Sequence, residues 1–176
     1  MYLISLYFDE KSTMLLQKYQ SEIEKKTQQY FLSRKKIPVH MTLSTVRKID
    51  EKLLIHHINE TISQFKTGVI NLVFIGSFSK NTIFISPVYD EYLHDLSKKM
   101  NHLISLISYQ KNDNRYQPFH WQPHVTLARK LDEKQLLTAF QIINQLFEPF
   151  QAKVTRIALS SSQPYHDIHV WNLKDG

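Results

Sequence analysis

Apolar residues recur along the chain at two spacings, and these predict which segments form strands and which form helices. Short apolar or alternating runs rich in β-branched and aromatic residues are typical of strands. We expect strands at residues 2–8, 39–46, 69–76, 82–86, 124–129, 152–160 and 168–173. Apolar residues three or four positions apart indicate amphipathic helices, which we expect at residues 10–32, 50–65, 90–107 and 132–147. Helices segregated from short, hairpin-linked strands predict an α+β fold with antiparallel sheets.

The order of these segments contains an internal repeat. The sequence RKIDEK at residues 47–52 returns as RKLDEK at residues 129–134, and each copy opens a predicted helix. Each copy is preceded by the pattern His-x-Thr-Leu, at residues 40–43 and 124–127. Self-similarity of this kind indicates a duplicated unit.

We therefore expect a single bilobal domain over residues 1–176, with an internal repeat of approximately 1–86 and 87–176. The two units are predicted to be related by a pseudo-twofold axis. Two antiparallel sheets would line a central cleft, with the helices outside them. The two His-x-Thr strands would then lie near the axis.

Residues alternate between the two faces of a strand, so each His-x-Thr pattern places its two polar side chains together. His40 and Thr42 share one face, and His124 and Thr126 do the same. If both faces look into one cleft, two imidazoles and two hydroxyls surround one point. Two copies at matched positions of a repeat are a stronger signal than one copy. A duplication that kept a structural motif twice would give the same pattern, and this alternative remains open.

Two imidazoles on either side of one phosphorus atom have the chemistry that a phosphodiesterase needs. Cleavage requires a base that deprotonates the nucleophile and an acid that protonates the leaving oxygen, and imidazole serves in either role near neutral pH. The hydroxyls of Thr42 and Thr126 can donate to the non-bridging oxygens and stabilise charge in the transition state. No group of residues has convincing metal-ligand spacing, so we predict neither a metal nor another cofactor.

Composition narrows the ways in which this chain can hold a phosphate. It has three glycines, with no two internal ones at the spacing of a phosphate-binding loop, and no cysteine to supply a thiolate. With 22 basic and 16 acidic residues the net charge is +6, which suits a polyanionic partner and is also an ordinary charge for solubility. Residues 1–8 are apolar but lack the basic start of a signal peptide. We expect a cytoplasmic protein that does not contact a membrane.

The paired HMTL and HVTL sequences resemble the two-histidine (2H) phosphoesterase superfamily, which includes 2′-5′ RNA ligase-like proteins and 2′,3′-cyclic nucleotide phosphodiesterases. The run WQPHVTLA at residues 121–128 and the segments around residues 75–78 and 85–87 are also similar to that family. The resemblance covers nearly the whole chain in its order of elements, and the two motifs are its specific part.

The resemblance implies a bilobal α+β fold and attack on a cyclic or 2′-linked phosphodiester. It further implies that His40 and His124 act as acid and base. Thr42 and Thr126 are then the phosphate ligands. Many relatives continue after the first motif with an aromatic residue and a glycine, whereas this chain has Ser44-Thr45-Val46. The substrate contacts at that edge of the first lobe therefore stay open.

Cations and aromatic residues around the second motif are candidates for substrate binding. The segment 109–123 has no periodicity and is long for a connection, which is typical of functional loops. Within it, Arg115 and Trp121 suit phosphate binding and base stacking, with packing beneath the loop as the alternative for Trp121. Arg129 is a candidate phosphate ligand, although alternation places it opposite the motif histidine unless the strand twists or ends there. His120 is a weaker candidate for a third imidazole.

The sequence thus predicts a metal-independent phosphodiesterase that acts on 2′,3′-cyclic or 2′-5′-linked phosphodiesters of nucleotides or RNA. A non-catalytic RNA-binding module is one alternative, since it would use the same basic surface without turnover. A 2′-5′ RNA ligase is another, because ligation runs the same acid–base chemistry in reverse. The expected partner is a nucleotide or RNA-end substrate, and no obligate protein partner is inferred.

Overall fold

The computed structural model describes residues 1–47, 49–107 and 114–176, and its seven strands are joined in one sheet. The strands are β1 (Tyr2–Phe8), β2 (Met41–Val46), β3 (Gly68–Phe78), β4 (Thr82–Pro87), β5 (Val125–Arg129), β6 (Phe150–Ser162) and β7 (Tyr165–Asn172). Their order is β1-β2-β5-β4-β3-β6-β7, and β6 also pairs with β1. All of these pairings are antiparallel. The predicted α+β class with antiparallel strands is confirmed.

The sheet differs from the prediction in one respect, because two sheets were expected and the pairings unite all strands in one. Met41 pairs with Val125, which joins β2 to β5. The long strand β6 pairs with β3 through residues 150–154 and with β1 through residues 154–161. Hydrogen bonding therefore runs in a closed circuit through β1, β2, β5, β4, β3 and β6. The repeat pattern could not reveal these junctions, since each joins strands from different halves of the chain.

Aspartates start the long helices. The helices are α1 (Glu10–Thr27), α2 (Phe31–Arg34), α3 (Glu51–Thr61), α4 (Glu91–Ile107) and α5 (Glu133–Leu146), with 3₁₀ turns η1 (Ile62–Gln64) and η2 (Asn114–Tyr116). The side chains of Asp9, Asp50, Asp90 and Asp132 each accept a hydrogen bond from a backbone N–H in the first turn of the helix that follows. Such caps satisfy otherwise unpaired N–H groups, which explains why the helix starts were readable from sequence.

The end of the first helix was predicted wrongly. Residues 10–32 were expected to be helical, but α1 ends at Thr27. Gln28 adopts a left-handed conformation (φ 56°), and its N–H donates to the carbonyl of Glu24. This backbone arrangement closes a helix whatever apolar spacing follows. The separate short helix α2 then leads toward the first motif strand.

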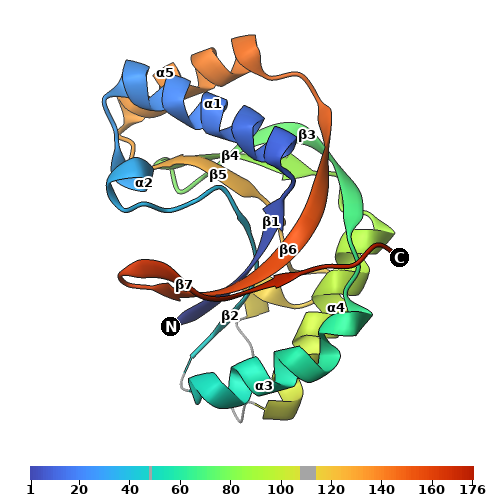
Figure 1. Ribbon diagram of the computed structural model, residues 1–176. Coiled ribbons are helices and arrows are strands. Elements are labelled where there is room, and N and C mark those ends of the chain that lie inside the picture. Colours follow the sequence, from blue (N-terminus) through green and yellow to red (C-terminus); the bar gives the residue numbers. More distant parts are fainter. Residues whose placement is uncertain (48, 108–113) are drawn as a thin grey trace.

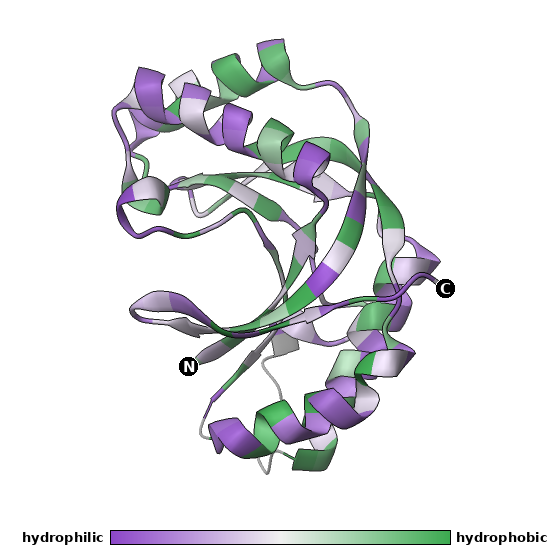
Figure 2. Cartoon of the chain, in the orientation of Figure 1, coloured by the Kyte–Doolittle hydropathy of each residue, from purple (hydrophilic) through white to green (hydrophobic). Residues whose placement is uncertain are grey.

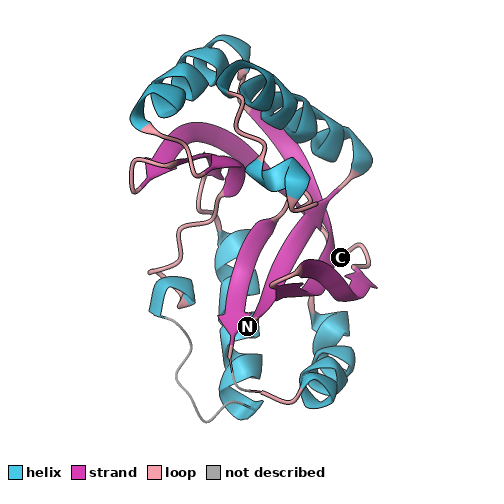
Figure 3. Cartoon of the chain, turned by 90° about the vertical axis from the view of Figure 1, so that its left-hand side faces the viewer, coloured by secondary structure: helices cyan, strands magenta, loops and turns pink. Residues whose placement is uncertain are grey.

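The helices form two pairs at opposite ends of the sheet (Figures 1 and 3). Helices α1 and α5 pack on each other and on β5 and β4, while α4 packs on β2 and α3 packs on α4. Apart from β1, α2 and the 3₁₀ turns, the order α1-β2-α3-β3-β4 is followed by α4-β5-α5-β6-β7. The bilobal duplication itself remains a prediction. Within the described part of the chain, no helix is long and apolar enough to cross a membrane.

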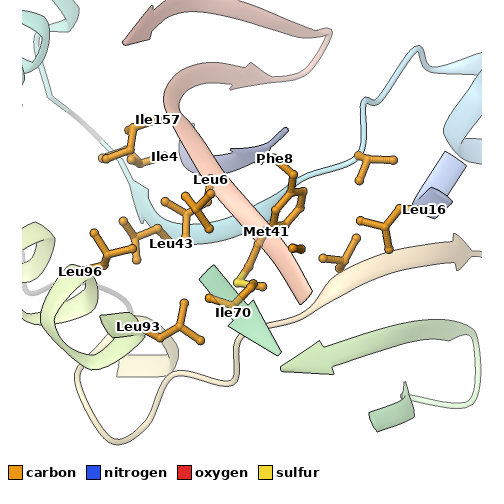
Figure 4. Packing of buried hydrophobic residues seen from close by; sticks show 14 of the residues in the cluster. Ile4, Leu6, Phe8, Leu16, Met41, Leu43, Ile70, Leu93, Leu96 and Ile157 are labelled. Carbon is orange, nitrogen blue, oxygen red and sulfur yellow. The ribbon is translucent and has the colours of Figure 1, made fainter. Parts of the chain in front are cut away.

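The motif strands are anchored by their apolar residues. Met41, Leu43, Val125 and Leu127 are all 0 % exposed. Figure 4 shows Met41 and Leu43 of β2 in the same cluster as Leu93 of α4. Full burial of one such side chain contributes about 1.5–3 kcal/mol. The apolar face therefore fixes both strands, and His40, Thr42, His124 and Thr126 remain partly exposed.

Candidate active site

Strands β2 and β5 bring the two His-x-Thr motifs side by side. Met41 pairs with Val125, and in an antiparallel pair the flanking residues of the two strands face each other. This register places His40 across from Thr126 and His124 across from Thr42. All four side chains are partly exposed. We call their shared face of β2 and β5 the motif face.

Both imidazoles are held in the same way. His40 Nδ1 lies 2.8 Å from the carbonyl oxygen of Pro38, and His124 Nδ1 lies 2.8 Å from that of Gln122. A carbonyl oxygen only accepts, so Nδ1 carries the proton in each ring. Each neutral imidazole therefore has its lone pair on Nε2, which is the atom that can take or return a proton.

The two histidines differ in the charges around them. Burial lowers the pKa of His40 below its ordinary value, the hydrogen bond to Pro38 raises it, the charge of His124 lowers it, and the Asp167 carboxylate raises it. Burial also lowers the pKa of His124, and the nearby Arg129 lowers it further, against the effect of the Gln122 carbonyl. The pKa of each histidine responds to neighbouring charge, and only that of His40 responds to a carboxylate.

An aromatic wall flanks His124 on the motif face. The His124 ring centroid lies 4.8 Å from that of Phe78 and 5.3 Å from that of Phe84, and these two phenylalanine rings are stacked 4.2 Å apart. Phe84 pairs with Gly76 on β3 and with Thr126 on β5. A Cβ atom at residue 76 would lie 2.5 Å from the Phe84 ring. Gly76 thus provides the room that lets Phe84 lie beside His124.

A polar network flanks His40 instead. The ring of Tyr165 lies 5.8 Å from that of His40, tilted by 35°. The Tyr7 hydroxyl donates to Asp167 Oδ1 at 2.8 Å and lies 3.0 Å from the Tyr165 hydroxyl. Ser160 Oγ donates to the same Asp167 oxygen at 2.7 Å. Burial, Tyr165 and Asp167 raise the pKa of Tyr7. Burial and the Asp167 charge raise the pKa of Tyr165, against the hydrogen bonds with Ser160 and Tyr7, so both phenols stay protonated as donors.

A β-bulge follows each motif at the same place. On β2 the register shifts at Leu43, which has no partner on β1, and on β5 it shifts at Leu127, which has no partner on β4. The extra residue changes the face of every residue that follows it. Thr45 and Arg129 are therefore returned to the motif face. The effect of the Arg129 charge on both histidines agrees with this position.

The carbonyl oxygen just before each bulge accepts a hydrogen bond from a side chain distant in sequence. Trp121 Nε1 donates to Thr42 O at 3.0 Å. Gln20 Nε2, on α1, donates to Thr126 O at 2.9 Å. A bulge disrupts the ladder locally, and these donors satisfy a backbone group at that point. The two bonds hold both motif strands where they change register.

A family model for the 2′-5′ RNA ligase superfamily matches residues 10–165 of the chain. The chain belongs to this superfamily of 2H phosphoesterases. The resemblance read from the paired motifs is confirmed. A comparison with the curated proteins finds no match.

Solved structures of related fold agree with this membership. E. coli LigT in apo form is 13% identical, with 99% of this chain and 97% of that chain covered and a TM-score of 0.61. TT0787 of Thermus thermophilus is 13% identical, covers 99% and 98% of the two chains, and has the same TM-score of 0.61. Usb1 of Kluyveromyces marxianus is 12% identical, covers 98% and 96%, and has a TM-score of 0.52. At these identities the likeness shows the fold.

The candidate substrate-binding residues occupy different positions relative to the motif face. Trp121 is 4 % exposed and its indole Nε1 donates to the Thr42 carbonyl on β2, as the packing alternative expects, and its binding of substrate remains a prediction. Arg129 lies on the motif face because of the bulge, which corrects the expectation from simple alternation. Arg115 and His120 are exposed near η2, and their roles remain predictions. Of the segment 109–123, residues 109–113 lie outside the described residues.

Several residues near the histidines were missed in the sequence. Phe78, Phe84, Tyr165 and Asp167 lie on strands far from the motifs in the chain, and Gln20 lies on a helix. Phe78 lies in the segment 75–78 that resembles the family, but no local pattern marks a role for the others, because sheet pairing and the packing of α1 on β5 bring them near the motif histidines. Their one sequence signal is that Gly76 precedes Phe78 and pairs with Phe84, as a glycine beneath an aromatic ring often does in sheets.

Proposed function

We propose that this protein is a metal-independent phosphodiesterase that acts on 2′,3′-cyclic or 2′-5′-linked phosphodiesters of nucleotides or RNA. The observation that carries the proposal is the matched pair of imidazoles on adjacent strands. Each has its Nδ1 bonded to a backbone carbonyl and its Nε2 left for proton transfer. Membership of the 2′-5′ RNA ligase superfamily supports this class of reaction.

The proposed hydrolysis needs one histidine in each protonation state. The neutral imidazole accepts a proton from water at Nε2 as the water oxygen attacks phosphorus. The protonated imidazole gives its Nε2 proton to the 2′ or 3′ oxygen as the phosphorus–oxygen bond breaks. Thr42 and Thr126 donate to the non-bridging oxygens, and the Arg129 guanidinium balances the negative charge of the phosphate.

A nucleotide substrate suits the aromatic wall and the polar network that flank the two histidines. The stacked rings of Phe78 and Phe84 provide an apolar surface beside His124, and aromatic surfaces bind nucleobases by stacking. The Tyr165 hydroxyl, near His40, can bond to ribose oxygens. E. coli LigT, 15% identical with 98% of this chain and 97% of that chain covered and a TM-score of 0.60, has been solved in complex with 3′-AMP. That complex supports a nucleotide rather than a small metabolite.

The decisive experiment measures turnover of 2′,3′-cyclic nucleotides and 2′-5′-linked dinucleotides by His40→Ala and His124→Ala. Loss of one general acid or base typically costs about 10²–10⁴-fold in rate, and we expect at least that loss from each variant with the melting temperature retained. His102→Ala, at an exposed position on α4, is the matched control. Full activity in either motif variant would exclude the acid–base assignment.

Two further readouts separate this proposal from its alternatives. Activity should persist in EDTA, because the two imidazoles supply both proton transfers. Loss in EDTA with recovery on addition of a divalent ion would contradict the metal-independent reaction. Adding an RNA with a free 5′-hydroxyl to the cyclic substrate tests for 2′-5′ ligation by the same residues. A binding module would retain RNA affinity in both histidine variants and turn over none of these substrates.

A further inference from the structure

A basic surface continues from the motif face onto α2. We call it the α2 strip; it comprises five cations and two aromatic residues: Arg34, Lys35, Lys36, Arg129, Lys130, Tyr30 and Phe31. All five cations are exposed. Helix α2 lies beside the end of β5, as Figure 1 shows, and the chain that leaves α1 toward it is largely hydrophilic in Figure 2.

The strip is physically continuous with the candidate site through Arg129. Arg129 Cζ lies 5.8 Å and Lys130 Nζ lies 4.6 Å from the centroid of the Phe31 ring. Arg34 Cζ lies 5.6 Å from the centroid of Tyr30. The same Arg129 lowers the pKa of both motif histidines. One arginine therefore belongs to the motif face and to the strip at once.

The cations of the strip form no ion pair among the described residues. Among the described residues, none of the five has a carboxylate within 4.0 Å. Glu24, which contacts α2, accepts a hydrogen bond from the backbone N–H of Ser33. Elsewhere Lys25, Lys99 and Lys153 are paired with carboxylates. Close like charges that carry no counter-charge suit a polyanion as their counterpart.

We propose that the α2 strip binds the nucleotides that adjoin the reacting phosphodiester, so that the preferred substrate is the end of a single-stranded RNA and not a mononucleotide. The proposal rests on the function proposed above and names its substrate class. Cations that lie beside aromatic rings suit a single strand, since phosphates contact cations and bases stack on rings. The positive charge of the strip and its continuity with the motif face through Arg129 favour single-stranded RNA as the ligand.

The test compares two substrates in one triple variant. R34Q/K35Q/K36Q removes three cations of the strip that lie outside the proposed catalytic residues. With an eight-nucleotide RNA ending in a 2′,3′-cyclic phosphate, we expect KM to rise about 10-fold or more and the log–log salt slope to fall by about 2, because each single-strand phosphate contact contributes about 0.7. With a 2′,3′-cyclic mononucleotide, kcat and KM should both remain at the wild-type values.

The control variant K52Q/K98Q/K174Q removes the same charge from exposed positions elsewhere and should leave both substrates unaffected. Equal losses on the oligonucleotide and the mononucleotide, or an unchanged KM for the oligonucleotide, would overturn the proposal. Binding of an RNA with a 3′-phosphate, followed by fluorescence anisotropy, keeps the test independent of turnover. Wild-type protein should bind it more tightly than R34Q/K35Q/K36Q even if no substrate is cleaved, and equal affinities would overturn the proposal.

Discussion

At the scale of single residues, Asp167 is the group that distinguishes the two histidines. Its carboxylate raises the pKa of His40, so Asp167→Asn should lower that pKa while Oδ1 still accepts from Tyr7 and Ser160. One limb of the pH–rate profile should move to lower pH and the other should stay in place. Movement of the alkaline limb identifies His40 as the acid, and movement of the acidic limb identifies it as the base.

NMR titration of the His40 ring gives the same pKa without turnover. Asp175→Asn is the control, because Asp175 bonds to Thr67 and Lys153, away from the network of Asp167. It should leave both limbs unchanged. An Asp167→Asn profile that superimposes on the wild-type profile would contradict the role given to this carboxylate.

Two internal glycines provide a matched pair for testing the aromatic wall. A Cβ atom at residue 76 meets Phe84, which contacts His124, whereas one at residue 68 meets Tyr92. Overpacking of this kind costs about 1–3 kcal/mol of stability. Gly76→Ala and Gly68→Ala should both lower the melting temperature, but only Gly76→Ala should also reduce kcat. A similar kcat for the two variants would show that Phe84 has no part in holding His124.

At the scale of elements, each motif strand is held at its β-bulge by a side chain from a distant part of the sequence. Gln20→Met and Trp121→Phe each remove a donor from the carbonyl that precedes a bulge while keeping most of the apolar volume. An unsatisfied buried carbonyl costs about 1–3 kcal/mol. Displacement of a motif residue by about 1 Å can reduce the rate about 100-fold. We therefore expect a loss of kcat of about 10- to 100-fold, with KM changed much less.

Gln135→Met is the control for these variants. Gln135 Nε2 donates to Thr27 O at 2.9 Å and Gln135 Oε1 accepts from the Asp132 N–H, so the substitution weakens the start of α5 and its contact with α1 without touching a motif strand. Chemical denaturation and steady-state kinetics on the same samples separate the two effects. If Gln20→Met and Gln135→Met lose stability and kcat in the same proportion, the bonds at the bulges are structural only.

The bulges also separate the features that local sequence predicts from those that depend on the register between strands. Helix starts were readable because an aspartate caps each long helix, and the His/Thr alternation was readable because it lies within one strand. The face of Arg129 was not, since it depends on the register between β5 and β4. The end of α1 depended on the left-handed backbone of Gln28, and the place of Asp167 depended on pairing between β6 and β7. Most of the features that were not predicted depend on how two segments pair, which the sequence of a single segment does not contain.

At the scale of the whole molecule, the sheet circuit makes the site a product of both halves of the chain. The Gln20 that supports Thr126 comes from the first half, and the Trp121 that supports Thr42 comes from the second. The network beside His40 likewise joins Tyr7 to Tyr165. Cleaving the chain or swapping one half cannot leave a complete set of contacts. The geometry of the candidate site is therefore coupled to the folding of both halves of the chain.

That coupling predicts how stability depends on pH. Burial lowers the pKa of both His40 and His124 in the folded protein, so the unfolded chain binds more protons as pH falls below about 6.5, the ordinary value for histidine. Stability should therefore be full above pH 6.5 and decline as the pH falls through the lowered folded-state values. Urea unfolding at a series of pH values between about 5 and 8 measures this slope.

The double variant H40Q/H124Q should flatten the slope in that range, because glutamine does not titrate, and it should be the more stable protein relative to wild type at the acidic end. H56Q/H102Q, which changes two exposed helical histidines, should keep the wild-type slope. The same burial that favours the neutral imidazole would then lower the free energy of unfolding in acid. Parallel slopes for wild type and H40Q/H124Q would refute the link between the motif histidines and global stability.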